Sequence, residues 1–276
     1  MITPFKIENV SYEDIISDIE SYVELFLSNG VLVFKSINLS AFEQENVTKA
    51  FGLRLNWGHI SMFDEEDHSF TINTFNKYNY SNSDILIPWH LENCHKTDRQ
   101  IASTWNMIKL ECSEDSGTTG FINTDDILAQ MKEGWIPFLR SATVTNSLID
   151  SYNLIDDIPA KPRIEKRGAL IPHRNTGKEI LNLSPRFHQD ALVGVNGQIP
   201  SSEEEEEFKL IKLWIEKTVS SYESEPAHWL KWSLNDLVIV DLSKIYHAVK
   251  GGFELGQRRF RRYWAYSSFE SMQRSI

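Results

Sequence analysis

The order of helical and extended segments constrains the fold of this chain most. Residues Tyr12–Leu27 carry apolar side chains at the three- and four-residue spacing of a helix. Gly30 should end this helix, since glycine readily adopts the left-handed conformation that terminates many helices. Ser40 and Glu43 have capping-box spacing and predict a second helix, which Gly52 should close. The first fifth of the chain is therefore predicted to be largely helical.

The rest of the chain is mainly strand-like. A short helix is predicted over Thr124–Met131, and a longer one follows Ser201, which should cap it. The acidic run Glu203–Glu207 is expected to be the solvated first turn of that helix rather than a metal site, because the helix dipole favours carboxylates there. Short apolar runs predict strands at 31–34, 101–110, 142–148, 237–241 and 260–266. Helices followed by many strands indicate an α+β protein with a sandwich or barrel core.

Composition excludes several classes of protein. The 28 Lys and Arg residues are outnumbered by 39 Asp and Glu residues, and the resulting net charge of -11 argues against a nucleic-acid partner. No apolar run approaches the roughly 20 residues that span a bilayer, so no membrane association is expected. The two cysteines, Cys94 and Cys112, form no CxxC pair, which predicts a reducing, cytoplasmic location.

The chain lacks repeats and linkers, which predicts a single domain over residues 1–276. Within it, residues 1–60 should supply the N-terminal helices and a strand, and residues 89–276 the core with a helical insertion at about 201–220. The segment 61–88 is dense in Asn, Ser and Asp and is either a plain surface excursion or a mobile lid.

The first residues that indicate chemistry are His90 and Glu92. In an extended chain, residues two apart point to the same face, so these two side chains should converge while Leu91 points away. An imidazole beside a carboxylate is half of a divalent-metal site. A single H-x-E motif also occurs by chance as a surface pair, so it does not identify a function by itself.

A second group of residues lies near the end of the chain. His247 follows a predicted strand, and Arg258 and Arg262 come eleven and fifteen residues later. Alternation in a strand places both arginines on one face with Phe260, an arrangement suited to carboxylate groups. Arg259 and Arg261 take the other face and are expected to lie on the surface.

Together these residues resemble the Fe(II)/2-oxoglutarate-dependent dioxygenases of the taurine dioxygenase and clavaminate synthase superfamily. Gly117–Phe121 is similar to the family's Gly-x-Thr-x-aromatic segment. His173–Gly177 is similar to its His-Pro-x-Thr-Gly-Arg region, with Arg174 in place of Pro and Lys178 in place of Arg. The family pattern is H-x-D or H-x-E, a Thr about thirty residues later, a distal His, and an Arg about eleven residues beyond it. Those positions are His90, Glu92, Thr119, His247 and Arg258.

The resemblance implies a fold and a chemistry. It implies a double-stranded β-helix (jelly-roll) core with flanking helices. His90, Glu92 and His247 would bind Fe(II), in the two-imidazole, one-carboxylate arrangement of non-haem iron oxygenases. The cosubstrates would be 2-oxoglutarate, whose distal carboxylate Arg258 and Thr119 would bind, and O2. The expected reaction is hydroxylation of an unactivated C–H, with release of succinate and CO2.

The substrate is a small molecule in this interpretation. Glu92 argues against halogenation, because the related halogenases lack a carboxylate there, and the H-x-E variant in hydroxylases of free amino acids favours an amino acid or a derivative. Arg262 matches a position that binds the substrate's anionic group in taurine dioxygenase, although a purely structural role is equally open. Asn73 and Phe187 are further candidates for the substrate pocket. Oxidative tailoring of a natural-product intermediate and a non-catalytic binding protein are the alternatives.

Overall fold

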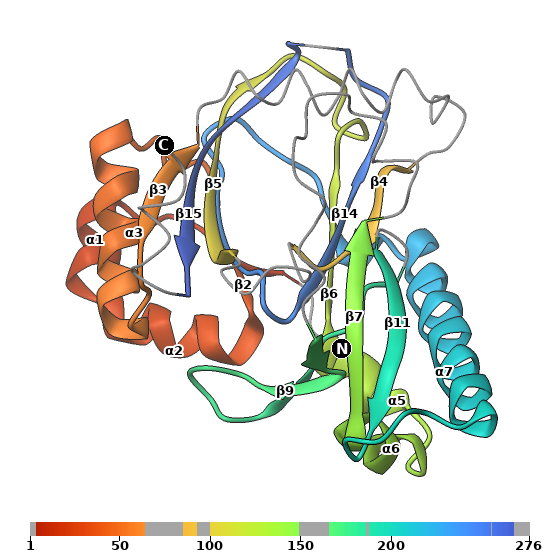
Figure 1. Ribbon diagram of the computed structural model, residues 1–276. Helices are drawn as coiled ribbons and strands as arrows, with labels where there is room; N and C mark the ends of the chain where they lie inside the picture. Colours follow the sequence, from red (N-terminus) through yellow and green to blue (C-terminus); the bar gives the residue numbers. More distant parts are fainter. Residues whose placement is uncertain are drawn as a thin grey trace.

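The computed structural model describes residues 4–63, 85–92, 100–148, 166–185, 188–254 and 256–267. It is a mixed α/β protein in which two sheets lie between outer layers of helices (Figure 1). The segment expected to form a lid, 61–88, falls mostly outside the described residues, and so do Asn73 and Phe187.

Six described strands form the larger sheet, and they come from both ends of the chain. Only β1 and β2 pair in parallel; the other neighbours are antiparallel. The predicted strands at 31–34, 101–110, 237–241 and 260–266 are confirmed as members of this sheet. Its order is β1 (Phe5–Ile7), β2 (Val31–Phe34), β13 (Leu237–Asp241), β5 (Gln100–Leu110), β15 (Arg258–Tyr266) and β3 (Ile60–Phe63).

Four described strands form the sheet that faces it. Their order is β12 (Trp229–Leu230), β6 (Thr119–Asn123), β14 (Ile245–Lys250) and β4 (Ile85–His90). A core cluster joins the inner faces of the two sheets, with Trp105, Met107 and Phe260 from the larger sheet and Phe121 and Ile245 from the smaller one. Apolar side chains line this interior, so polar groups buried in it are shielded from water.

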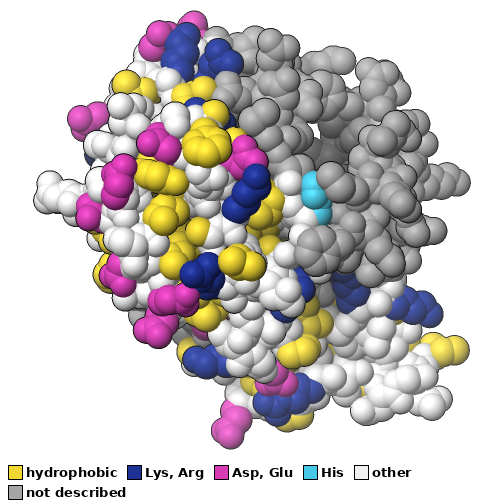
Figure 2. Space-filling model, turned by 90° about the vertical axis from the view of Figure 1, so that its left-hand side faces the viewer, with side chains coloured by type: hydrophobic (Ala, Val, Ile, Leu, Met, Phe, Trp, Pro, Cys, Tyr) yellow, Lys and Arg dark blue, Asp and Glu magenta, His cyan; other side chains and the backbone are white. Residues whose placement is uncertain are grey.

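The N-terminal helices cover the outer face of the larger sheet. They are α1 (Tyr12–Ser17), α2 (Ile19–Asn29) and α3 (Ala41–Leu55). The predicted helix 12–27 is in fact two helices that meet at Asp18, and it ends as expected at Gly30, whose φ is 77°. Acidic, basic and hydrophobic side chains are interspersed on this outer face (Figure 2).

One helix boundary was wrong. Gly52 does not end α3, which continues to Leu55 and is terminated by Asn56 at a φ of 52°. A Cβ at Gly52 would lie 2.9 Å from Ile60 Cδ1 and 3.2 Å from Trp57 Cε3. The glycine therefore lets α3 approach its neighbours closely, and its position within a helix could not be told from a terminating glycine by sequence alone.

A third layer packs behind the smaller sheet. It holds the paired strands β11, β7 and β8 and the hairpin β9–β10, which are covered by α5, α6 and α7. Ser201 caps α7 as predicted, and the core side of that helix is buried. None of the described helices is long and apolar enough to cross a membrane. The bounds are β7 (Ala142–Leu148), β8 (Lys166–Gly168), β9 (Leu170–Pro172), β10 (Glu179–Leu181), β11 (His188–Val195), α5 (Thr124–Gln130), α6 (Trp135–Ser141) and α7 (Ser202–Ser221).

Candidate active site

Three side chains of types that can bind a metal meet where β4 pairs with β14, and they are called the metal-binding group below. His90 ends β4 and lies directly opposite His247 of β14, with ring centroids 4.1 Å apart. Glu92 follows β4 in a turn, and its Oε2 lies 3.5 Å from His247 Nε2 and 4.0 Å from His90 Nε2. One ligand atom from each residue lies within 4.8 Å of the others. The convergence predicted for His90 and Glu92 is therefore present, and the fold adds His247 from a distant part of the chain.

The charge states of this group suit a divalent cation. Burial and the neighbouring His247 lower the pKa of His90 to about 3, so its imidazole is neutral at neutral pH. His90 Nδ1 lies 2.7 Å from the carbonyl oxygen of Pro88, which only accepts, so Nδ1 carries the proton and Nε2 keeps its lone pair. Burial raises the pKa of Glu92, but the hydrogen bond and charge of His247 outweigh it and hold that pKa at about 2. A neutral imidazole and a carboxylate are thus in the forms that bind metal.

Arg258 bridges the two sheets beside this group. It starts β15, and its Nη2 donates a hydrogen bond of 3.0 Å to Thr119 Oγ1 of β6. Both side chains are buried, and the guanidinium carbon lies 4.4 Å from the Phe260 ring centroid. Burial, with the charge of Arg262, lowers the pKa of Arg258 to about 9, which still leaves it charged at neutral pH.

Arg262 lies on the same strand, two residues beyond Phe260. Its guanidinium carbon is 5.0 Å from the Trp105 ring centroid and 5.4 Å from that of Phe260. Burial lowers its pKa to about 10, and the carboxylate of Glu92 opposes that shift. The Nε atoms of Arg258 and Arg262 are buried without a hydrogen-bond partner among the described residues. Two cations, one buried and one half-buried, each with a buried unused Nε donor, make the interior suited to anionic ligands.

Two glycines explain how the Gly-Thr-Thr-Gly segment fits here. Gly117 has a φ of 64°, and a Cβ there would lie 3.0 Å from Arg258 Cδ. A Cβ at Gly120 would lie 3.0 Å from Trp229 Cζ3 and would overlap Trp89, the residue before His90. Gly117 therefore leaves room for Arg258, and Gly120 leaves room for Trp89 and Trp229.

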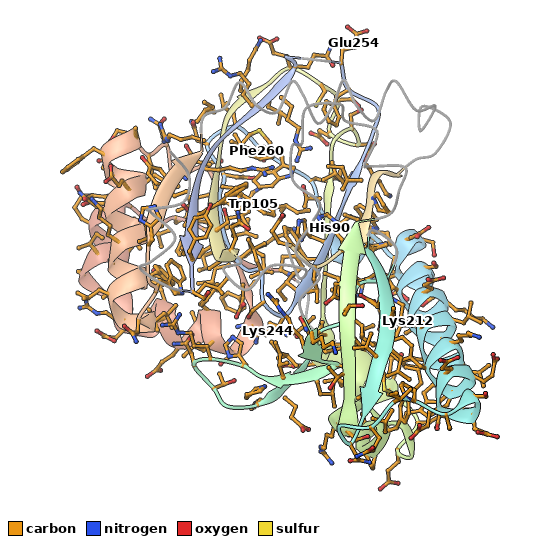
Figure 3. All side chains as sticks on the ribbon, viewed as in Figure 1. His90, Trp105, Lys212, Lys244, Glu254 and Phe260 are labelled. Carbon is orange, nitrogen blue, oxygen red and sulfur yellow. The ribbon has the colours of Figure 1, made fainter. Side chains whose placement is uncertain are left out.

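Two aromatic residues of the site, Trp105 and Trp232, were not predicted. Trp105 contacts His247 at 5.7 Å between ring centroids, and with Phe260 and His90 it lies in the interior between the sheets (Figure 3). Trp232 donates a 2.9 Å hydrogen bond from Nε1 to Thr119 Oγ1. Alternation within the predicted strand 101–110 could have indicated the inward position of Trp105. No sequence signal indicated Trp232.

One surface assignment was wrong. Arg261, which was expected to be a plain surface residue, is half-buried and donates hydrogen bonds of 2.6 Å to Gln44 Oε1, 2.6 Å to the carbonyl oxygen of Leu39 and 3.0 Å to Asn106 Oδ1. It anchors α3 and the loop before it to the larger sheet. The helical layer covers this face of β15, which strand alternation alone does not reveal. Arg259 is exposed as expected.

His173, from the segment that resembles the family's His-Pro-x-Thr-Gly-Arg region, lies outside the metal-binding group. Its Nε2 is 2.8 Å from Asp241 Oδ2 at the end of β13, and its Nδ1 is 3.0 Å from Thr176 Oγ1. The contact with Asp241 holds the β9–β10 hairpin against the larger sheet, so the role of His173 is structural.

Solved structures show the same fold. AAD-2 in complex with Mn(II) and N-oxalylglycine matches with a TM-score of 0.65 and 16% identity, covering 97% of this chain and 96% of that one. A candidate alpha-ketoglutarate-dependent 2,4-D dioxygenase from Burkholderia xenovorans matches with a TM-score of 0.64 and 12% identity, covering 97% and 95%. A taurine dioxygenase from Burkholderia xenovorans matches with a TM-score of 0.59 and 14% identity, covering 96% and 89%.

The sequence comparisons agree with this likeness. No curated protein sequence matches the chain. The model of the family described as taurine catabolism dioxygenase TauD, TfdA family, matches residues 2–264. That match takes in nearly the whole chain, including all three residues of the metal-binding group. The protein therefore belongs to the TauD/TfdA family and is an Fe(II)/2-oxoglutarate-dependent dioxygenase that uses O2.

Proposed function

We propose that this enzyme hydroxylates an unactivated C–H bond of a small molecule that carries an anionic group, such as a free amino acid or an amino-acid derivative. The observation that carries the proposal is the position of the buried Arg258 and the half-buried Arg262 beside the His90, Glu92 and His247 group. Arg258 would bind the cosubstrate, and Arg262 would remain for the substrate.

The metal ligands in this proposal are His90, Glu92 and His247. Their donor atoms lie close enough to share one cation, and two imidazoles with one carboxylate suit Fe(II) while leaving coordination positions open. When bound, the iron supplies the oxidation of the C–H bond at the expense of 2-oxoglutarate and O2, with succinate and CO2 as the other products. The protein holds His90 in the correct tautomer through the carbonyl of Pro88.

Arg258 and Thr119 would bind the distal carboxylate of 2-oxoglutarate. The two side chains are already joined by a hydrogen bond, and four of the arginine's five N–H groups remain for a ligand or for neighbouring groups. Burial of the pair excludes water, which strengthens each charge-assisted hydrogen bond to a carboxylate.

Arg262 would bind the anionic group of the substrate. Its position on the same face of β15 as Arg258, next to Trp105, places it at the inner wall of the site. Glutamate at position 92 is less common in the family than aspartate, and it favours an amino acid or a derivative as the substrate. Asn73 and Phe187 remain predictions for the substrate pocket.

We also propose a jelly-roll core within a single domain. Two facing, mainly antiparallel sheets and the likeness to the dioxygenase structures support it. A cytoplasmic location is supported by the small number of cysteines, two in the whole chain.

The test measures succinate release with Fe(II) and 2-oxoglutarate. The candidate substrates are free amino acids and their acylated derivatives, and the controls are carboxylic acids that are not amino acids. A substrate-dependent rise above uncoupled turnover, with a product heavier by one oxygen atom, supports the proposal. A product with two fewer hydrogens or a new ring would instead support oxidative tailoring. Release that no amino acid or derivative stimulates would contradict the proposed substrate class.

A further inference from the structure

The hydroxyl oxygen of Thr119 receives two hydrogen bonds, one from each of two side chains. Trp232 Nε1 lies 2.9 Å from Oγ1, and Arg258 Nη2 lies 3.0 Å from the same atom. The indole N–H and the guanidinium N–H groups only donate, so the threonine oxygen must accept both bonds. A hydroxyl oxygen has two lone pairs, and both are therefore used.

The remaining hydrogen-bonding capacity of Thr119 is its own O–H proton. With both lone pairs engaged, that proton can point neither at Trp232 nor at Arg258. Among the described residues, no acceptor is found for it within hydrogen-bonding distance. A buried O–H without an acceptor is costly, which indicates that a bound ligand supplies one.

We propose that Trp232 is a positioning residue that directs the Thr119 proton onto the distal carboxylate of 2-oxoglutarate. The inference rests on the proposed role of Arg258 and Thr119 in binding that carboxylate. Trp232 would act only through Thr119, by occupying the second lone pair. The consequence is selectivity for a cosubstrate with a distal carboxylate rather than for a 2-oxo acid with a methyl end.

The surroundings of Trp232 hold its N–H in place. The side chain is 5% exposed and packs edge-on against Phe260, with ring centroids 4.6 Å apart. Its backbone lies two residues beyond Leu230, which pairs with Thr119 across β12 and β6. The following turn is fixed by the backbone N–H of Ser233, which donates to Asp236 Oδ2 at 2.7 Å. An indole also has no acceptor nitrogen, unlike histidine, so it cannot draw the threonine proton away.

The experiment measures dissociation constants of the anaerobic Fe(II) enzyme for 2-oxoglutarate and for 2-oxopentanoate, which lacks the distal carboxylate, from the visible band of the iron chelate. Trp232→Phe should weaken 2-oxoglutarate by about 3- to 10-fold, the effect of one hydrogen bond, and leave 2-oxopentanoate nearly unchanged. Thr119→Val should weaken 2-oxoglutarate at least as much, and Thr119→Ser should retain most of the affinity.

A double-mutant cycle separates positioning from packing. In the Thr119→Val background, Trp232→Phe should have no further effect on 2-oxoglutarate, because the hydroxyl that it orients is gone. Trp229→Phe is the matched control. It also removes a buried indole N–H bond, 3.1 Å to the carbonyl oxygen of Glu223, but Trp229 does not bond to Thr119. It should bind both oxo acids like the parent enzyme.

The outcomes distinguish this inference from the proposed function. Equal weakening of both oxo acids by Trp232→Phe, or a full effect in the Thr119→Val background, would show a structural role and overturn the inference alone. Unchanged 2-oxoglutarate binding in both Arg258→Ala and Thr119→Val would overturn the proposed cosubstrate pocket, and the role of Trp232 with it. If Trp232→Phe does not fold, a lack of difference between Thr119→Val and the parent enzyme decides against the inference.

Discussion

Two buried polar groups of this protein differ in how their charges are satisfied. Behind the smaller sheet, the Asp190 carboxylate accepts from Lys212 of α7, from Asn146 of β7 and from the backbone N–H of Ser184. Between the sheets, no described carboxylate forms an ion pair with Arg258 or Arg262, and the Nε atom of each has no partner there. In this outer network the buried carboxylate has a cation and two further donors, and it joins a helix to strands. The inner group is incomplete and faces the metal-binding residues.

This contrast separates charges that stabilise the fold from charges that bind ligands. A buried ion pair with all its hydrogen bonds made contributes to a specific packing arrangement, and removing one partner leaves an uncompensated charge. A buried cation with unused donors is unfavourable until a ligand arrives. Substitutions in the outer network should therefore alter stability, and those in the inner group should alter binding and turnover.

The largest effect is expected from the metal-binding group. His247→Ala should abolish iron binding and succinate release while leaving the fold intact, because it removes one of three ligands. The measurements are bound iron, succinate and the circular dichroism spectrum. His59→Ala is the control, since His59 stacks on Tyr266 away from the group and the variant should keep its iron. Normal turnover in His247→Ala would refute the assignment.

Arg258→Ala should separate ligand binding from stability. We expect the KM for 2-oxoglutarate to rise by about 100-fold, from the loss of a bidentate charge-assisted partner. The melting temperature of the ligand-free protein should stay the same or increase, because a buried charge without an ion-pair partner is removed. Arg259→Ala, at the exposed neighbouring position, is the control for both measurements. A large fall in the melting temperature of the ligand-free protein would show that Arg258 has a structural role, as the Asp190 network has.

Lys212→Met should lower stability and leave activity unchanged, which is the reverse of the effect expected for Arg258→Ala. It leaves Asp190 buried without its cation and should lower the free energy of unfolding by about 3 kcal/mol, with the turnover of the folded enzyme unchanged. Burial raises the pKa of Asp190, so its protonated form is favoured in the folded state. The variant should therefore regain stability as the pH falls, and Asp190→Asn added to it should restore stability at neutral pH. Urea unfolding at several pH values tests this, and a pH-independent loss would contradict it.

Arg262→Ala tests whether Arg258 and Arg262 bind different ligands. The KM for the substrate should rise by about 10-fold, while the KM for 2-oxoglutarate changes little, because Arg258 keeps the cosubstrate. Steady-state kinetics with each compound varied in turn provides the measurement. Equal effects on both constants would show that the two arginines act on one ligand.

The smallest effect is expected at the β9–β10 hairpin. Burial raises the pKa of Asp241, but the hydrogen bond and charge of His173 outweigh it and hold that pKa below its ordinary value. A lowered carboxyl pKa contributes stability that is present above pH 3.8 and is lost as the pH falls through the folded value. His173→Asn should cost about 1 kcal/mol at neutral pH and nearly nothing in strong acid. An equal loss at both pH values would assign the effect to packing.

Much of the site could be predicted because its signals are local or lie at family spacing. His90 and Glu92 need only the alternation of an extended chain, and Arg258 and Arg262 share a face for the same reason. Helix caps such as Ser40 and Ser201 were also predictable, because a capping box involves residues three apart.

Other features depend on contacts between distant segments. Arg261 was misplaced because the helical layer that packs on it comes from another part of the chain. Gly52 was misplaced because Trp57 and Ile60, which follow α3, fold back closely onto it. Trp232 was missed because its significance is one hydrogen bond to Thr119, 113 positions away. No local pattern encodes such a pairing.

The sequence alone determined the helix caps at Ser40 and Ser201, the alternating faces of the strands and the residue types able to bind a metal and an oxo acid. These follow from backbone sterics and from side-chain alternation over a few residues. The tertiary structure decided which polar groups are completed by the protein and which are left for ligands. That outcome depends on how the two sheets, the third layer of strands and the helices that cover them pack. Burial removes water, so each polar group depends on the partners that the fold supplies.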